Sequence, residues 1–344
     1  MWVLWLSLVS FIGTVADHWL PNSNLAFANP TSVQSSFLYR TIKWDGILWR
    51  EIASLGYHKP ALATFFPLYP VVTKLLASVV PHLDVAWVGL AVSAISLLGS
   101  LLVLYQLFNL DVDGSTATQA LWYLLLFPTA LFFALMYSES LFLLLSALTF
   151  FFLRKQRWFW CGVFGMLAAL TRPVGVLLFI PAVIELVSAY RMRRPFSLSS
   201  LWLLLIPFGL IVYMAYLQWH FGNPWLFLEA QKVYNRFSSQ YLRTLLDSLT
   251  LVRGLFFSGV LVAGVVIYRR IRRSYGIYVL IQLLPPLLSG SLTSINRYAV
   301  VLFPIPLLMA VVLQRRVLRI LAYIISAGSL IFYISRYVNG YWVG

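Results

Sequence analysis

The stretch "VAWVGLAVSAISLLGSLLVLYQLFN", residues 85–109, runs for 25 residues without one charged side chain. As a helix it is long enough to span the ~30 Å hydrocarbon core of a bilayer, because a helix rises about 1.5 Å per residue. Similar apolar runs recur along the whole chain. A helix satisfies its own backbone hydrogen bonds in lipid, so these runs predict an all-α polytopic membrane protein.

The composition supports this class. Of the 344 residues, 61% are hydrophobic and only 10% are charged, and the mean hydropathy is +0.86. A soluble domain carries roughly 25% charged residues, so this chain has too few to cover a water-exposed surface. We predict a single integral membrane domain over residues 1–344 with about eleven transmembrane helices. They are expected at 2–19, 85–109, 117–136, 138–153, 158–171, 173–190, 201–220, 249–268, 275–290, 298–314 and 320–336.

Basic residues in the short loops predict the orientation. The clusters are "RKQR" (154–157), "RMRR" (191–194), "YRRIRR" (268–273) and "QRRVLR" (314–319), and together they hold 13 of the 25 lysines and arginines. The expected helices place all four clusters on one face, which is therefore predicted to be cytoplasmic. Contact with anionic membrane lipids explains this charge, and no nucleic-acid partner is expected. The N-terminus then lies in the cytoplasm, on a first helix that is retained because it lacks a basic segment before it.

The opposite face is predicted to be exoplasmic and carries most of the remaining polar chemistry. It includes two long loops, residues 20–84 and 220–248. All four histidines and seven of the ten acidic residues fall on this predicted face. The single cysteine, Cys161, excludes an internal disulfide and a cysteine-rich metal site. No two histidines are spaced i, i+4, so a zinc site is not expected.

The first exoplasmic loop predicts two short helices. Residues 44–55 form an amphipathic pattern, with Trp44, Ile47, Leu48, Ile52 and Leu55 on one face. A second helix is expected over 65–80, along the membrane surface. Asp45 occupies a typical N-cap position. Capping and catalysis are both open to it, because an acid held at the membrane boundary beside Lys43 and Arg50 could serve as a general base.

Six short motifs, in this order, resemble a known family. They are "KWDGILWREIASLGY" (43–57), "FFPLYP" (65–70), "YSESLF" (137–142), "TRPVG" (171–175), "GNP" (222–224) and "NRYAVVLFP" (296–304). The ordered set is similar to the GPI second-mannose transferases, of the phosphatidylinositol-glycan class V type, and their prokaryotic relatives.

The resemblance implies a GT-C fold, a many-helix bundle with a catalytic acid and two juxtamembrane helices in the first outer loop. It implies Asp45 as that acid and a polyprenyl-phosphate sugar as donor, typically mannose on dolichyl phosphate. The acceptor, lipid-linked or glycan, is left open.

The location of the acid favours the same chemistry independently. Nucleotide sugars stay in the cytoplasm, so an exoplasmic site needs a sugar carried across on a lipid. An acceptor hydroxyl would attack the anomeric carbon and displace the lipid phosphate, while a carboxylate takes the hydroxyl proton. A carboxylate also favours an oxocarbenium-like transition state. A single displacement inverts the anomeric centre.

The leaving phosphate needs cations, and arginine suits it because its planar fork meets phosphate oxygens in pairs. The candidates at helix ends are Arg297, Arg172 and Arg336. Arg172 precedes Pro173, a residue typical of a first helical turn. Anchoring of these arginines at the membrane interface is the alternative interpretation.

Further substrate-binding candidates are Trp44, Glu139, His58, Tyr298, Glu51 and Asp17. Glu139 has two interpretations, as an acid that favours a helix N-terminus and as a second acid or sugar-hydroxyl acceptor. No cofactor is expected to be required. A Mg²⁺ or Mn²⁺ ion held by Asp45 and the lipid phosphate is left open.

Two other functions compete with a glycosyltransferase. A lipid or sugar transporter or flippase would favour internal repeats and ionisable residues at mid-membrane depth. No clear repeat is visible, and Glu185 is the main charge inside a predicted span. A non-catalytic subunit of a lipid-assembly complex would not need Asp45.

Overall fold

The computed structural model describes residues 1–19, 36–191, 198–234 and 241–343, and these residues form helices joined by turns. The N-terminal half holds α1 (Trp2–Trp19), α2 (Ser36–Thr41), α3 (Asp45–Leu55), η2 (Pro60–Thr64), α4 (Leu68–Val79), α5 (Val85–Phe108), α6 (Gly114–Leu125), η3 (Ala130–Ala134), α7 (Glu139–Arg154) and α8 (Trp158–Thr171). The C-terminal half holds η4 (Pro173–Leu178), α9 (Phe179–Arg191), η5 (Leu198–Leu204), α10 (Leu205–Phe221), α11 (Leu226–Glu229), η6 (Ala230–Tyr234), α12 (Tyr241–Ser248), α13 (Leu251–Arg270), α14 (Arg273–Ile281), α15 (Leu284–Leu288), α16 (Ile295–Ala299), α17 (Pro304–Val312) and α18 (Arg316–Val338). Parts of both predicted exoplasmic loops and of the "RMRR" cluster lie outside the described residues.

Within the described part of the chain, four helical stretches are long and apolar enough to cross a membrane. They are Val85–Phe108, Leu198–Phe221, Leu251–Arg270 and Arg316–Val338. Shorter apolar helices lie at Trp2–His18, Leu68–Val79, Trp158–Thr171 and Pro173–Ala189. The count of about eleven transmembrane helices therefore stays a prediction.

Three of the predicted spans are interrupted, each close to a proline. The span expected at 117–136 divides into α6 and η3, with Pro128 between them. The span at 275–290 divides into α14 and α15, and Pro285 lies in the first turn of α15. The span at 298–314 begins as the short α16 and restarts at Pro304. Proline has no backbone N–H to donate, so it ends one helix or begins the next.

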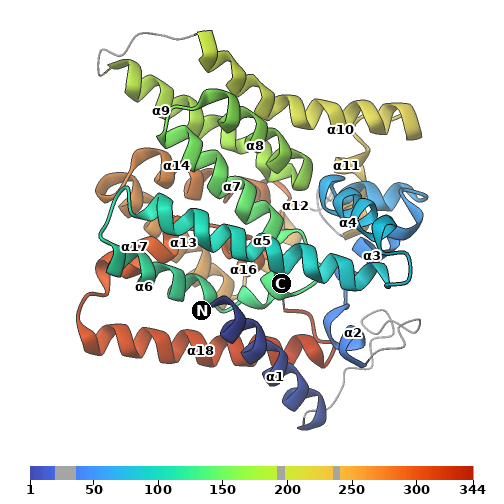
Figure 1. Ribbon diagram of the computed structural model, residues 1–344, viewed down its shortest axis with the longest axis horizontal. Helices are drawn as coiled ribbons and strands as arrows, with labels where there is room; N and C mark the ends of the chain where they lie inside the picture. The colour runs from blue at the N-terminus through green and yellow to red at the C-terminus, as the bar shows by residue number, and fades with distance from the viewer. Residues whose placement is uncertain (20–35, 192–197, 235–240, 344) are drawn as a thin grey trace.

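The bundle is packed through close helix pairs, with α5 against α7, α7 against α8, and α8 against α10. Figure 1 shows α18 along one edge of the bundle with α1 beside it, and α9 and α10 along the opposite edge. Glycine permits the closest of these approaches. A Cβ atom at Gly162 of α8 would lie 2.0 Å from the carbonyl oxygen of Trp202. A Cβ atom at Gly209 of α10 would lie 2.5 Å from the carbonyl oxygen of Met166.

The two short helices expected in the first outer loop are α3 and α4, which pack on one another and on α5 (Figure 1). The buried face of α3 agrees with the predicted apolar face at Ile52 and differs from it elsewhere. Trp49 is buried, with its ring 4.9 Å from Phe65 and 5.3 Å from Tyr69, whereas Leu55 is 68% exposed. Trp49 points toward α4. The spacing of apolar residues within a single helix does not predict this contact, because it depends on the position of the neighbouring helix.

Ion pairs and hydrogen bonds fix this loop to the bundle. Arg50 contacts Asp84 through Nε at 3.1 Å and Nη2 at 2.7 Å, and Asp84 accepts a cap hydrogen bond from the N–H of Ala86 at the start of α5. His220, at the end of α10, lies 2.8 Å from the carbonyl oxygen of Tyr57. The two loops predicted to be exoplasmic therefore meet on one side of the bundle.

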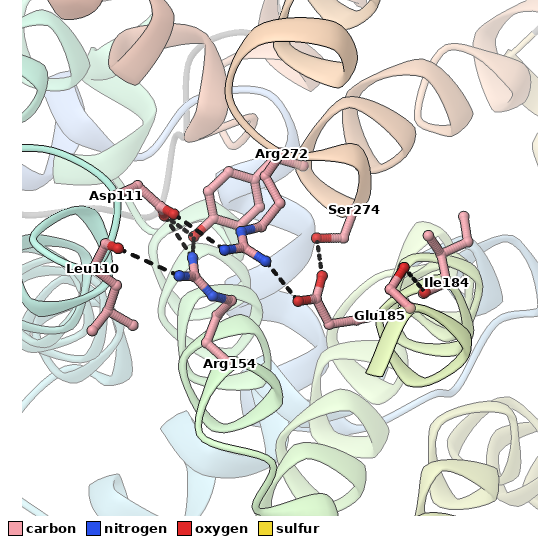
Figure 2. A network of polar contacts seen from close by, with 9 residues as sticks. Leu110, Asp111, Arg154, Ile184, Glu185, Arg272 and Ser274 are labelled. Atoms are coloured by element: carbon pink, nitrogen blue, oxygen red, sulfur yellow. Dashed lines mark hydrogen bonds and ion pairs between the residues drawn. The ribbon is translucent and has the colours of Figure 1, made fainter. Parts of the chain in front are cut away.

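Charged residues from separate turns also meet at a second place in the bundle (Figure 2). Asp111, after α5, pairs with Arg154 at the end of α7 and with Arg272 just before α14. Arg272 also pairs with Glu185 of α9. The basic clusters 154–157 and 268–273 therefore lie together. Which end of the bundle faces the cytoplasm stays a prediction.

Candidate active site

Asp45 is the first residue of α3 and not its N-cap. The N-cap position is occupied by Trp44, whose φ of 56° and ψ of −124° place it in a backbone region that residues with a side chain rarely adopt. The predicted capping role of Asp45 is therefore wrong. Its carboxylate instead accepts a hydrogen bond from Nη1 of Arg297, 252 residues further along the chain.

Two buried tyrosines hold the strained turn that precedes α3. The hydroxyl of Tyr137 donates to the carbonyl oxygen of Lys43 at 2.9 Å, and the hydroxyl of Tyr337 donates to the same oxygen at 3.1 Å. The Trp44 ring packs edge-on against Trp342, with ring centroids 5.2 Å apart. Strain of this kind costs on the order of 1–3 kcal/mol and persists only where the surroundings enforce it. Here those surroundings fix the position of Asp45.

Glu139 lies at the start of α7 and is fully buried. Its Oε1 accepts a hydrogen bond from Nε of Arg297 and lies 2.9 Å from Nη1 of Arg172. Ser138 is at the N-cap position of α7 but makes no side-chain cap hydrogen bond. Glu139 therefore joins two arginines that are separated by more than a hundred residues in the sequence.

Aromatic rings surround both guanidinium groups. The guanidinium carbon of Arg297 lies 4.6 Å from the centroid of Tyr137 and 5.1 Å from that of Phe132. The corresponding atom of Arg172 lies 5.5 Å from Tyr298. Cation–π contacts of this kind stabilise a charge that has lost water. Arg172 and Arg297 are only 7% and 8% exposed, so the protein replaces most of their hydration with carboxylates and rings.

A cavity of about 900 Å³ opens beside this cluster. Its polar lining residues include Asp45, Arg172, Arg297, Ser291, Thr293 and Ser294. Its apolar lining residues include Val174, Val176, Leu177, Leu210, Phe227 and Leu228, from η4, α10 and α11. A lining with both kinds of residue suits a ligand with a charged or polar head and an apolar tail.

The structure brings together five of the predicted site residues in this cavity wall: Trp44, Asp45, Arg172, Arg297 and Tyr298. Glu139 lies directly behind the arginines and is too buried to meet a ligand. Its predicted role as a second acid or sugar-hydroxyl acceptor therefore lacks geometric support.

Four other predicted residues have different surroundings and do not line the cavity. Glu51 pairs with His58 at 2.9 Å and with Lys59 at 2.7 Å. Asp17 pairs with Arg40 at 2.7 Å. The guanidinium of Arg336 lies 3.9 Å from the ring centroid of Tyr341. The structure gives no geometric support to a substrate contact for Glu51, His58 or Asp17, nor to a phosphate contact for Arg336.

The sequence interpretation missed the hydroxyl residues of "SGSLTS", residues 289–294, which line the cavity together with Trp342. A cluster of hydroxyl groups shortly before "NRY" in so apolar a chain could have indicated a polar binding surface. Among the described residues, no three histidine, cysteine, aspartate or glutamate side chains converge in a way that could hold a metal ion.

No family model and no curated protein matches the chain. Among solved structures, the chain is similar to ArnT from Cupriavidus metallidurans, crystallised with undecaprenyl phosphate bound. The TM-score is 0.56 at 16% sequence identity, over 91% of this chain and 60% of that protein. The chain thus spans less than two thirds of the length of ArnT.

At this identity the likeness shows the fold alone. The chain is an integral, multi-pass membrane protein with an all-helical bundle that resembles the membrane fold of ArnT, which supports the expected GT-C architecture at the level of the fold. Membership of the mannosyltransferase family suggested by the motifs stays a prediction.

Proposed function

We propose that the protein is a membrane glycosyltransferase that moves a sugar from a polyprenyl-phosphate donor to an acceptor hydroxyl, with Asp45 as general base. One observation carries this proposal. A carboxylate and two buried arginines line a large cavity that also has many apolar lining residues. The bound undecaprenyl phosphate of ArnT supports a lipid of the same class here, because the two proteins share a fold.

The donor has three parts, the phosphate, the sugar and the prenyl chain, and different lining residues suit each part. Arg172 and Arg297 meet the phosphate, because guanidinium groups pair with phosphate oxygens and stay charged at every physiological pH. Ser291 and Thr293 also line the cavity, and their hydroxyl groups suit a phosphate or a sugar. The prenyl chain lies along apolar lining residues that include Leu177 and Phe227.

The reaction follows from these positions. The acceptor oxygen bonds to the anomeric carbon, the bond from that carbon to the phosphate oxygen breaks, and the leaving oxygen keeps the electron pair. Asp45 takes the proton of the acceptor hydroxyl, and the two arginines stabilise the charge that develops on the phosphate. A single displacement inverts the anomeric centre, so a β-linked donor gives an α-linked product. Mannose is the sugar we propose, on the family resemblance.

No metal is required in this proposal, because the two guanidinium groups supply the positive charge that a leaving phosphate needs. In this structure the Asp45 carboxylate already has a cationic partner, Arg297. Transfer that persists in excess chelator supports the arginine mechanism. Transfer that requires added Mg²⁺ or Mn²⁺ contradicts it.

Transfer is tested in vesicles that contain the purified protein, radiolabelled polyprenyl-phosphate mannose and a membrane lipid extract. The expected result is a labelled product that disappears in Asp45→Asn and persists in Glu51→Gln. Glu51 is a matched control because it lies on the same helix but outside the cavity wall. Movement of the donor across the bilayer without transfer would instead identify a flippase, and neither activity would point to a non-catalytic subunit.

The exoplasmic location is tested by cysteine labelling. Cys161 is buried and is replaced by serine, and Leu55→Cys then introduces an exposed thiol at the end of α3. A membrane-impermeant reagent is expected to label this thiol from the exoplasmic side. Labelling from the cytoplasmic side would contradict the use of a lipid-linked donor, since nucleotide sugars are available there.

A further inference from the structure

We infer that Arg297 exchanges partners during the reaction: Asp45 occupies its Nη1 in the resting protein, and the donor phosphate replaces Asp45 and so releases the base. This inference rests on the proposed function. It concerns how Asp45 is released from Arg297 so that it can accept the proton of the acceptor hydroxyl.

The two contacts of Arg297 differ in accessibility. Nε donates to Glu139, which is fully buried, whereas Nη1 donates to Asp45, whose side chain is 20% exposed and lines the cavity. A phosphate that enters the cavity can therefore reach the tip of the guanidinium but not its Nε side. The rings of Tyr137 and Phe132 restrict the guanidinium further. Exchange requires only a change of partner at the tip.

The resting ion pair holds the Asp45 carboxylate on Arg297. Protonation of Asp45 in this pair would leave Arg297 without one of its two compensating carboxylates, because arginine itself cannot lose its proton. Loss of one partner from a buried ion pair is strongly unfavourable. A carboxylate that has left the guanidinium avoids this penalty and accepts the proton of a hydroxyl more readily.

The donor phosphate provides the right charge for this exchange. A phosphate that bridges a lipid and a sugar carries one negative charge, as does Asp45, so Arg297 keeps the same charge balance when the partners change. Arg172 lies on the same Oε1 of Glu139, 2.9 Å away, and offers a second cation to the phosphate. The released Asp45 then takes the acceptor proton as the sugar leaves, loses it to water, and pairs with Arg297 again when the lipid phosphate departs.

The exchange is tested by the binding of undecaprenyl phosphate to the purified protein in detergent, with no acceptor present. Four variants form a double-mutant cycle: the unchanged protein, Asp45→Asn, Arg297→Gln and the double variant. Removal of the competing carboxylate is expected to tighten binding about tenfold when Arg297 is present. In the Arg297→Gln background the same change is expected to alter the affinity by less than about twofold.

Two results would overturn the inference. One is an unchanged or weaker affinity in Asp45→Asn, and the other is an equal gain in both backgrounds, which would indicate general charge repulsion. If Arg297→Gln does not fold, Arg297→Lys takes its place, because an ammonium group lacks the planar fork that serves two partners at once. A gain in the Lys background as large as in the unchanged protein would again contradict the exchange.

The proposed function fails separately from the inference. If undecaprenyl phosphate binds neither the unchanged protein nor any variant, the donor class is wrong. If it binds the unchanged protein and Glu51→Gln alike but shows no dependence on Asp45, only the partner exchange is wrong.

Discussion

Two networks in this protein have the same charges and different surroundings. The first contains Asp45, Glu139, Arg172 and Arg297, and the second contains Asp111, Glu185, Arg154 and Arg272 (Figure 2). In each, one carboxylate contacts two arginines: Glu139 in the first and Asp111 in the second. In each, one arginine reaches on to the second acid: Arg297 to Asp45 and Arg272 to Glu185.

The surroundings decide what each network can do. In the second network the hydroxyl of Tyr275 donates to Asp111 at 3.1 Å and that of Ser274 donates to Glu185 at 2.8 Å, beside a cavity of about 200 Å³. In the first, Asp45 lines a cavity of about 900 Å³ that has many apolar lining residues. The same charges therefore form a structural brace between helix ends in the second network and a candidate catalytic site in the first. The two networks differ in the size of the cavity beside them.

The largest expected effect is a difference in transfer rate between variants of Asp45 and Glu185, the more accessible acid of each network. Asp45→Asn is expected to lower the transfer rate about 100- to 10,000-fold, the usual contribution of a general base. Glu185→Gln is expected to leave the rate per folded molecule within about threefold. Initial rates of mannose transfer, normalised to the folded protein by size-exclusion chromatography, check both. Equal losses in the two variants would remove the functional distinction between the networks.

The next effect concerns the carboxylates that join two arginines. Glu139→Gln and Asp111→Asn each leave arginines with too little negative charge, and each is expected to destabilise the fold by about 3–5 kcal/mol. Only Glu139→Gln is expected to lower the transfer rate of the folded fraction as well, about tenfold or more, because it frees Arg172 and Arg297 to move. Thermal unfolding in detergent and transfer assays on the same samples measure the two effects. A matching loss of rate in Asp111→Asn would contradict the assignment of that network as a brace.

A smaller effect is expected at the pair that fixes α3 to α5. Burial raises the pKa of Asp84, but hydrogen bonds from Arg50 and from the N–H of Ala86 outweigh burial and hold that pKa below its ordinary value. The stabilisation is present above the unfolded pKa, near 4, and is lost as the pH falls further. Thermal unfolding between pH 3 and 6 is expected to show this loss, reduced in Asp84→Asn. An identical pH dependence in the variant would contradict it.

The smallest effect concerns Lys43, a buried cation next to the candidate site. Burial lowers the pKa of Lys43 to about 8, against an opposing contribution from Asp17. The unfolded chain then binds more protons than the folded one between pH 8 and 10.5, so the free energy of unfolding rises over this range. Lys43→Met is expected to abolish that rise in thermal unfolding scans. A rise that survives in Lys43→Met would show that another group causes it.

The sequence determined the membrane class, the short helices of the first outer loop and the candidates Asp45, Arg172 and Arg297. These depend on local patterns: apolar runs, helical spacing and arginines next to helix ends. The prolines that interrupt two helices, Pro128 and Pro285, are also visible in the sequence, but the apolar runs around them predict continuous spans. Apolar content alone does not show where a backbone hydrogen bond is missing.

Only the tertiary structure decided which of the polar residues act together. Arg297 contacts Glu139 across 158 residues of sequence and Asp45 across 252, and no local pattern relates these positions. Nor does any local pattern exclude Glu51 and Arg336 from the site. Their residue types suit a substrate contact, but their neighbours lie outside the cavity wall. A side chain's chemistry is set by the charges, rings and open space within a few ångströms, and in a helical bundle those neighbours come from distant segments.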